Sequence, residues 1–282
     1  VAVLMSGDVQ AWIEESYNGV VMPMGAQELD IPEIAEPVTL KVGASPSPHA
    51  EILEHVKPLL AEHNVELDIV EFDDYVMPNT GVEDGSLDAN YFQTLPYLKS
   101  FNEGKGTHLE TVIGVHVEPF GGYSSKYKKL ADLPDGATIA IPNEGSNSGR
   151  ALLLLQKAGL ITLKGTSATK LYSVADIKSN PKNFKIKEVA TEQAARVLKS
   201  VDAAVVNNDY ANPAGLGDKQ TIYVEPINKY SYQWINIIVA RKKDKNKKAY
   251  KEVVKAYQTE KTKQLYKKYY GSKQVAAWDA KF

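Results

Sequence analysis

The chain has 282 residues, of which 43% are hydrophobic, and its formal net charge is −2. This length allows one large or two modest domains, and the near-neutral charge gives no bulk attraction to nucleic acid or to a membrane surface. The sequence contains no cysteine, which excludes disulfides, thiolate nucleophiles and cysteine-ligated metal centres. No apolar run in it approaches the roughly 20 residues that a membrane-spanning helix needs.

Residues 1–37 differ from the rest of the chain. They contain neither lysine nor arginine, their apolar residues follow no regular period, and they end in a proline-containing stretch. We therefore treat residues 1–37 as an N-terminal extension of unknown origin and exclude it from the fold prediction.

From residue 38 onward, predicted strands alternate with predicted helices. β-Branched and apolar runs predict strands at 38–43, 65–70, 87–92, 110–117, 138–141, 185–189, 203–206 and 234–240. Apolar residues at helical spacing predict helices at 50–63, around Leu152, at 192–200 and at 247–270. This βαβα alternation favours an α/β fold with parallel sheets.

A loop of small polar residues, 142–150, connects the strand at 138–141 to a buried-looking helix. Ser146 or Asn147 can cap this helix, whose first N–H groups and dipole favour an anion. Arg150 follows in the first turn, where a cation opposes the helix dipole at a cost of about 0.3–1 kcal/mol. A ligand carboxylate would reverse that effect. A capped helix with Arg150 in a structural salt bridge explains the loop equally well.

Two amides and a tyrosine follow the strand at 203–206. Open α/β folds bind ligands at the carboxyl ends of their strands, and Asn207 and Tyr210 stand at such an end. Amide groups both donate and accept hydrogen bonds, which suits the ammonium and carboxylate of an amino acid. Capping of the next helix by Asn208 or Asp209 is an equally good explanation.

Aromatic residues in the segment 90–97 can form one wall of an apolar pocket. Phe92 and Tyr97 are the candidates. Packing in the core at the end of a strand is the simpler explanation.

No pattern in the sequence indicates catalysis, a cofactor or a metal site. The lysine-rich C-terminal stretch is typical of a solvated helix face, because its tyrosines fall at core spacing, and it does not indicate binding to nucleic acid. An enzyme that binds a small carboxylated substrate at these same residues and acts on it stays open as an alternative. The histidines show no metal-ligand spacing; they are His49, His55, His63, His108 and His116.

Several stretches from about residue 38 to the end carry one family resemblance, and they occur in order. They are 72–79, 88–98, 117–124, 139–160, 180–183, 207–211 and Trp278. Together they are similar to the NlpA/MetQ family of substrate-binding lipoproteins, which serve methionine-type ABC importers. The resemblance implies an extracytoplasmic, membrane-anchored binding protein for an amino acid, most readily methionine, with the importer's membrane subunits as partners.

The resemblance also implies a two-lobe, periplasmic-binding-protein-like (type II) fold, in which each lobe is a mixed, largely parallel sheet flanked by helices. Lobe 1 is expected at 38–130 and 232–282, and lobe 2 at 131–231, with the ligand contacted from both. By motif position, Arg150 holds the ligand carboxylate, two amides bind its polar groups and aromatic residues enclose its side chain. The expected ligand-binding residues are Tyr75, Phe92, Thr94, Tyr97, Asn147, Arg150, Asn207 and Tyr210.

The chain departs from the family at two places. Thr94 stands where the family usually has histidine, which changes the size of the pocket and leaves another amino acid or a short peptide open as the ligand. The family also carries a lipid-modified cysteine at its mature start, and this cysteine anchor is absent from the present chain.

Overall fold

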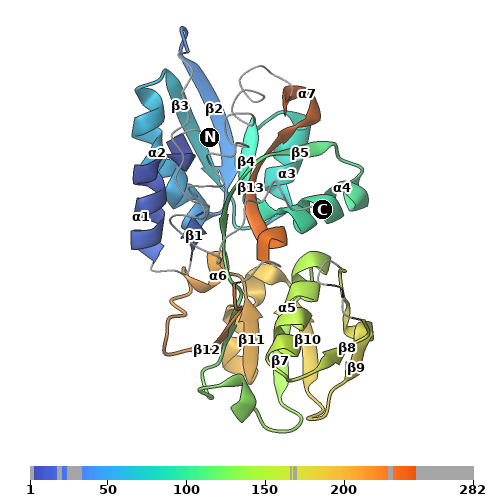
Figure 1. Cartoon of the computed structure of the whole chain (residues 1–282). Coiled ribbons are helices and arrows are strands. Elements are labelled where there is room, and N and C mark those ends of the chain that lie inside the picture. The colour runs from blue at the N-terminus through green and yellow to red at the C-terminus, as the bar shows by residue number, and fades with distance from the viewer. Residues whose placement is uncertain are drawn as a thin grey trace. The chain divides into compact units, whose positions relative to one another are not determined.

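The computed structural model describes residues 3–17, 21–23, 34–165, 167, 170–227 and 231–245 (Figure 1). The predicted helix at 247–270 and Trp278 lie outside these residues. The chain divides into two compact units, which are Val1–Glu118 with Ile227–Phe282, and Pro119–Pro226. Both crossings between the units therefore come earlier in the chain than the lobe boundaries expected after residues 130 and 231. None of the helices in the described part has the length and hydropathy needed to span a bilayer.

The first unit contains a six-stranded mixed sheet with the order β1-β5-β13-β4-β2-β3. The strand β2 pairs in parallel with β3 and β4, whereas the central strand β13 pairs antiparallel with both β4 and β5. The strands are β1 (Met22–Pro23), β2 (Val38–Ala44), β3 (Val65–Glu71), β4 (Ala89–Thr94), β5 (Leu109–Val117) and β13 (Ile235–Arg241). The helices are α1 (Gly7–Tyr17), α2 (Glu51–Ala61), α3 (Met77–Asp84), α4 (Leu95–Lys105) and α7 (Lys242–Lys245).

The N-terminal segment belongs to the core of this unit, so its treatment as a separate extension is wrong for the part that the structure describes. Val9 and Ile13 lie four residues apart on α1 and are completely buried in the first unit's core. The ring of Trp12 stacks on His55 of α2, with 4.0 Å between the ring centroids. The acidic composition of the segment hid this apolar face, because the face is short and its neighbours are charged.

The second unit contains a five-stranded mixed sheet with the order β10-β7-β11-β6-β12. The strands β10, β7 and β11 are parallel, and β6 pairs antiparallel with β11 and β12. The strands are β6 (Gly121–Tyr123), β7 (Thr138–Pro142), β10 (Lys185–Val189), β11 (Ala203–Val206) and β12 (Thr221–Val224). Beside them lie α5 (Gly145–Lys157), α6 (Asn208–Ala211) and a separate hairpin of β8 (Thr162–Leu163) and β9 (Ile177–Ser179).

The α/β class is confirmed, and both sheets are mixed, with a smaller parallel share than expected. The segment predicted as one helix at 192–200 is instead two short 3₁₀ helices, Thr191–Gln193 and Arg196–Ser200. Ala194 and Leu198 are its buried apolar residues in the cluster beside β11.

Candidate ligand-binding site

The loop between β7 and α5 caps its helix with an acidic side chain. The carboxylate of Glu144 accepts hydrogen bonds from the backbone N–H groups of Ser146 (2.7 Å) and Asn147 (3.0 Å). The expectation that Ser146 or Asn147 is the cap is therefore wrong. Glu144 stands at the N-cap in extended conformation, and its longer side chain reaches the N–H groups of the first turn. These two N–H groups consequently bind a carboxylate of the protein itself.

Arg150 lies in the second turn of α5, and its exposed fraction is 2%. Its Nε and Nη2 atoms donate hydrogen bonds to Oε2 of Glu225, at 3.0 Å and 2.6 Å. The guanidinium also lies over the ring of Phe120, 4.2 Å from the ring centroid, which is a cation–π arrangement. The structure thus pairs Arg150 with a buried carboxylate that sequence reasoning missed. A repeated Val-Glu-Pro tripeptide, at 117–119 and 224–226, is the signal that marks it.

Gly149 allows the start of α5 to pack closely against a neighbouring segment. A Cβ atom at this position would lie 2.9 Å from the backbone nitrogen of Tyr172 and 3.1 Å from its carbonyl oxygen. Backbone atoms cannot move aside as a flexible side chain can, so a side chain here would push α5 away. The glycine next to Arg150 is therefore a packing requirement that holds the arginine in place.

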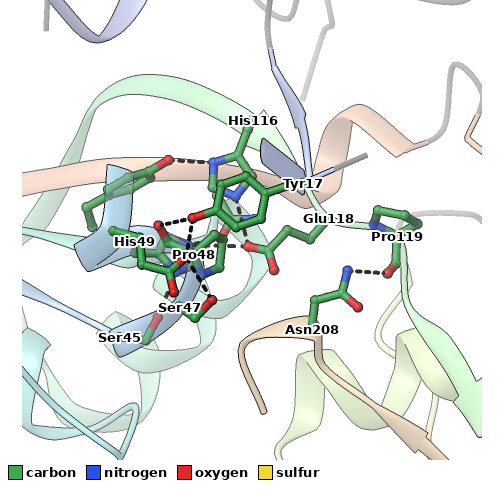
Figure 2. Close-up of polar contacts among 12 residues, drawn as sticks. Tyr17, Ser45, Ser47, Pro48, His49, His116, Glu118, Pro119 and Asn208 are labelled. Carbon is green, nitrogen blue, oxygen red and sulfur yellow. Dashed lines mark hydrogen bonds and ion pairs between the residues drawn. The ribbon is translucent and has the colours of Figure 1, made fainter. Parts of the chain in front are cut away.

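Asn207 stands between β11 and α6 and makes no capping bond with its side chain. Its Oδ1 atom is buried and has no hydrogen-bond partner among the described residues. Asn208, the alternative cap, is the first residue of α6, and its Nδ2 donates to the carbonyl oxygen of Pro119 at 2.9 Å (Figure 2). Since β7 and β11 are parallel neighbours, Asn207 and the start of α5 emerge at the same edge of the second sheet.

The predicted aromatic residues of the first unit form one cluster. Phe92 on β4 and Tyr97 on α4 have ring centroids 5.8 Å apart, and Tyr75 lies 5.6 Å from Phe92. The hydroxyl of Tyr97 donates to the backbone carbonyl of Tyr75 at 2.8 Å. Phe101, which the sequence did not single out, completes the cluster. The rings are mostly buried, so the cluster has the character of a small core whose edge includes the half-buried Tyr75.

Thr94 is the last residue of β4 and is half-buried. Its Cα partner on β13 is Asn236, and Asn236 is in turn the partner of His116 on β5. The predicted specificity position therefore belongs to a row of polar residues across three strands at one edge of the first sheet.

A buried histidine network lies at this edge (Figure 2). His116 Nε2 lies 2.8 Å from Oε1 of Glu118, and His49 Nε2 lies 3.0 Å from Asn236 Oδ1 and 3.4 Å from the same carboxylate oxygen. The Nδ1 atoms bond to hydroxyls, His49 to Ser45 at 2.7 Å and His116 to Tyr91.

Burial lowers the pKa of His49 to about 4 and that of His116 to about 3, although Glu118 acts in the opposite direction on His49. Both imidazoles are therefore neutral at physiological pH.

His49, His116 and Glu118 are also the residues of the described chain that can hold a metal ion, since their ligand atoms lie within 4.8 Å of one another. Histidine and carboxylate are a suitable donor set for a transition metal. Sequence reasoning missed this cluster, because His49, in the helical turn Pro46–Ala50, and His116, on β5, lie far apart in the chain. However, each Nε2 atom is already in hydrogen-bond contact with a carboxylate or amide oxygen. The Nε2 atoms of both histidines thus have hydrogen-bond partners, and protons occupy the positions that a metal ion would take.

The eight predicted binding residues divide evenly between the units. Both sets lie near sheet edges where parallel strands end, as ligand sites of α/β folds do. The first unit holds Tyr75, Phe92, Thr94 and Tyr97, and the second holds Asn147, Arg150, Asn207 and Tyr210.

Two mixed α/β units joined by two crossings, with polar residues at the strand ends, define the class of two-unit substrate-binding proteins. The comparisons with known proteins specify the family. Residues 40–278 match the model of the NlpA lipoprotein family, and the chain belongs to this family. It is 40% identical to the probable D-methionine-binding lipoprotein MetQ of Haemophilus influenzae, over 90% of this chain and 93% of that protein.

Solved structures agree with this assignment. A nutrient-binding protein from Burkholderia cenocepacia bound to methionine is 40% identical, with a TM-score of 0.72 over 84% of this chain and 99% of that one. The substrate-binding protein of a methionine transporter from Streptococcus pneumoniae is 37% identical, with a TM-score of 0.71 over 85% of this chain and 100% of that one. The family resemblance and the substrate-binding class predicted from the sequence are thereby confirmed.

Proposed function

We propose that this chain is the extracytoplasmic solute-binding protein of an ABC importer and that its ligand is an amino acid, methionine in the first place. The proposal rests on two groups that lie at the same sheet edge. One is a buried guanidinium, and the other is a side-chain amide whose oxygen has no hydrogen-bond partner among the described residues. Arg150 is buried at the start of α5, and the Oδ1 atom of Asn207 has no described partner at the same sheet edge. A cation and an amide acceptor bind the carboxylate and the ammonium of a zwitterion.

The roles of the remaining residues follow from their chemistry. Asn147, with an exposed fraction of 5%, adds a second amide one turn before Arg150 on α5. The aromatic cluster of Tyr75, Phe92 and Tyr97 provides the apolar, polarisable surface that a thioether favours. Thr94 lies between Phe92 and Tyr97 in the chain, and Tyr210 follows Asn207 on α6. The related proteins that bind methionine, from Burkholderia cenocepacia and Streptococcus pneumoniae, support the choice of ligand.

These groups bind a ligand and carry out no reaction on it. Amides and a permanently charged guanidinium neither accept nor release protons near neutral pH. The enzyme alternative would need a carboxylate or lysine with a strongly shifted pKa beside the ligand. We therefore propose a binding protein without catalytic activity, which delivers its ligand to the membrane subunits of the importer. In its natural form, an N-terminal lipid anchor that this chain does not contain would attach it to the membrane.

Isothermal titration calorimetry tests the proposal. The protein is unfolded, dialysed free of ligand and refolded, and it is then titrated with the twenty amino acids and with short methionine-containing peptides. We expect saturable binding of methionine at the lowest concentration. Absence of binding to any amino acid or peptide, by protein that has regained its native circular dichroism, would falsify the proposal.

A further inference from the structure

Glu225 continues the ladder between β6 and β12. Val224 is the Cα partner of Gly121 in the antiparallel pair, and Glu225 follows it. Its N–H donates to the carbonyl oxygen of Phe120 at 2.9 Å, and the N–H of Phe120 donates back to Oε2 of Glu225 at 3.2 Å. The backbone therefore fixes this side chain beside the guanidinium of Arg150.

A single oxygen atom of Glu225 accepts three hydrogen bonds. They come from Nε and Nη2 of Arg150 and from the N–H of Phe120. Both charged side chains are 3% exposed, so solvent and salt screen the ion pair only weakly. The positive charge that the proposed function assigns to the ligand carboxylate is already balanced by a carboxylate of the protein.

We propose that Glu225 sets the affinity and the release of the ligand by competing with the ligand carboxylate for Arg150. This inference rests on the proposed function of Arg150. A second carboxylate that approaches the guanidinium is attracted by its charge and repelled by Glu225. In a weakly screened site, that repulsion between charges about 5 Å apart weakens binding by about tenfold or more. Glu225 thus keeps Arg150 paired in the empty protein and limits how tightly a carboxylated ligand is held.

The variant Glu225→Gln isolates the charge. The glutamine oxygen still accepts hydrogen bonds from Arg150, so the orientation of the guanidinium is kept while the negative charge is removed. Binding is measured by calorimetry with methionine and with methioninamide, which has the same side chain and ammonium group but no carboxylate. We expect the dissociation constant of Glu225→Gln for methionine to fall by about tenfold and that for methioninamide to stay within about threefold of wild type.

Two control variants accompany this comparison. Glu188→Gln removes a carboxylate that contacts the same helix through the hydroxyl of Ser148, at 3.1 Å, and it should change neither constant. Glu225→Asp keeps the charge, so its preference between the two ligands should stay close to that of wild type.

The outcomes separate the possible roles. Equal changes for both ligands would assign Glu225 a purely structural role, and weaker or unchanged methionine binding would overturn the competition. A wild-type protein that binds no amino acid would instead contradict the proposed function.

If Glu225→Gln does not fold, the wild-type protein still allows a test, because the chain has only three arginines, Arg150, Arg196 and Arg241. The NMR resonance of the Arg150 Nε–H group should shift on addition of methionine and stay in place with methioninamide. A resonance that methionine leaves unmoved would overturn the inference.

Discussion

Two buried glutamates stand before the prolines at the two crossings between the units, and they differ in their partners. Glu118 ends the first unit and contacts His116 at 2.8 Å, whereas Glu225 precedes Pro226 at the end of the second unit and contacts Arg150 at 2.6 Å. Both follow a valine that ends a strand, and both side chains are less than one-tenth exposed. The local sequence Val-Glu-Pro is the same in the two places.

The partner decides what each glutamate can do. Burial keeps the two imidazoles beside Glu118 neutral, so this carboxylate belongs to a network of hydrogen bonds that responds to acid. The guanidinium beside Glu225 is permanently charged, so another carboxylate can compete with Glu225 for it. The same tripeptide motif therefore supports the fold in the first unit, whereas in the second unit its glutamate lies where it can limit ligand affinity.

The largest effect is expected when Arg150 is replaced by alanine. This change leaves the carboxylate of Glu225 buried without its cation, which should lower the free energy of unfolding by about 3–5 kcal/mol. Methionine binding should weaken by about 2–5 kcal/mol, because a buried charge-assisted pair is lost. Urea unfolding and calorimetry measure the two quantities.

The matched control for this change is Arg196→Ala, which removes an exposed arginine of the same unit and should alter neither quantity by more than about 0.5 kcal/mol. Adding Glu225→Ala to Arg150→Ala should restore part of the stability and none of the binding. Unchanged methionine affinity in Arg150→Ala would return Arg150 to a purely structural salt bridge.

A smaller effect is expected from the histidines beside Glu118, and it depends on pH. Their folded-state pKa values, about 4 for His49 and about 3 for His116, lie below the unfolded value of 6.5. As the pH falls through this interval, the unfolded chain binds protons that the folded chain does not. Each histidine should therefore lower the free energy of unfolding by up to about 1.4 kcal/mol per pH unit between about pH 6 and pH 4.

The variant His116→Gln isolates this effect. Glutamine can donate to Glu118 but does not titrate, so the slope of stability against pH should be shallower by about one proton. Urea unfolding of both proteins at pH 7, 6, 5 and 4 gives the slopes. Parallel curves would mean that His116 has the same proton affinity in both states.

The smallest effect is expected at Thr94, which ends β4 two residues after Phe92. Replacement by histidine, the usual family residue, should change the relative affinities for methionine and other amino acids in favour of methionine by about 1 kcal/mol. Competition calorimetry measures the order of preference. The exposed Thr80 of α3 provides the control variant Thr80→His. An unaltered order of preference would place Thr94 outside the pocket.

Much of the fold was predictable because it depends on local patterns. β-Branched runs predicted β2, β3, β5, β7, β10, β11 and β13 to within about two residues, which is the usual precision of such boundaries. The same reasoning failed at α1, whose short apolar face is surrounded by acidic residues, and at 191–200, where tight turns replace a regular helix. The predicted lobe boundaries also differ from those of the structure, because the sequence alone does not distinguish a proline at a crossing between units from a proline in an ordinary turn.

The candidate site was predictable only in part. Arg150 and Asn207 each follow a strand that the sequence predicted, but only the structure showed that these strands are parallel neighbours, so that both residues reach one sheet edge. The partner of Arg150 was not predictable, since Glu225 lies far along the chain and is brought near by the pairing of β6 and β12. The histidine network was missed for the same reason.

By itself, the sequence determined the α/β class and the family, because strand and helix periods and short motifs are local properties of the chain. The tertiary structure decided which charges meet. Burial determines how strongly these groups interact. Removal from water strengthens the contact between Arg150 and Glu225, and it keeps His49 and His116 neutral beside Glu118.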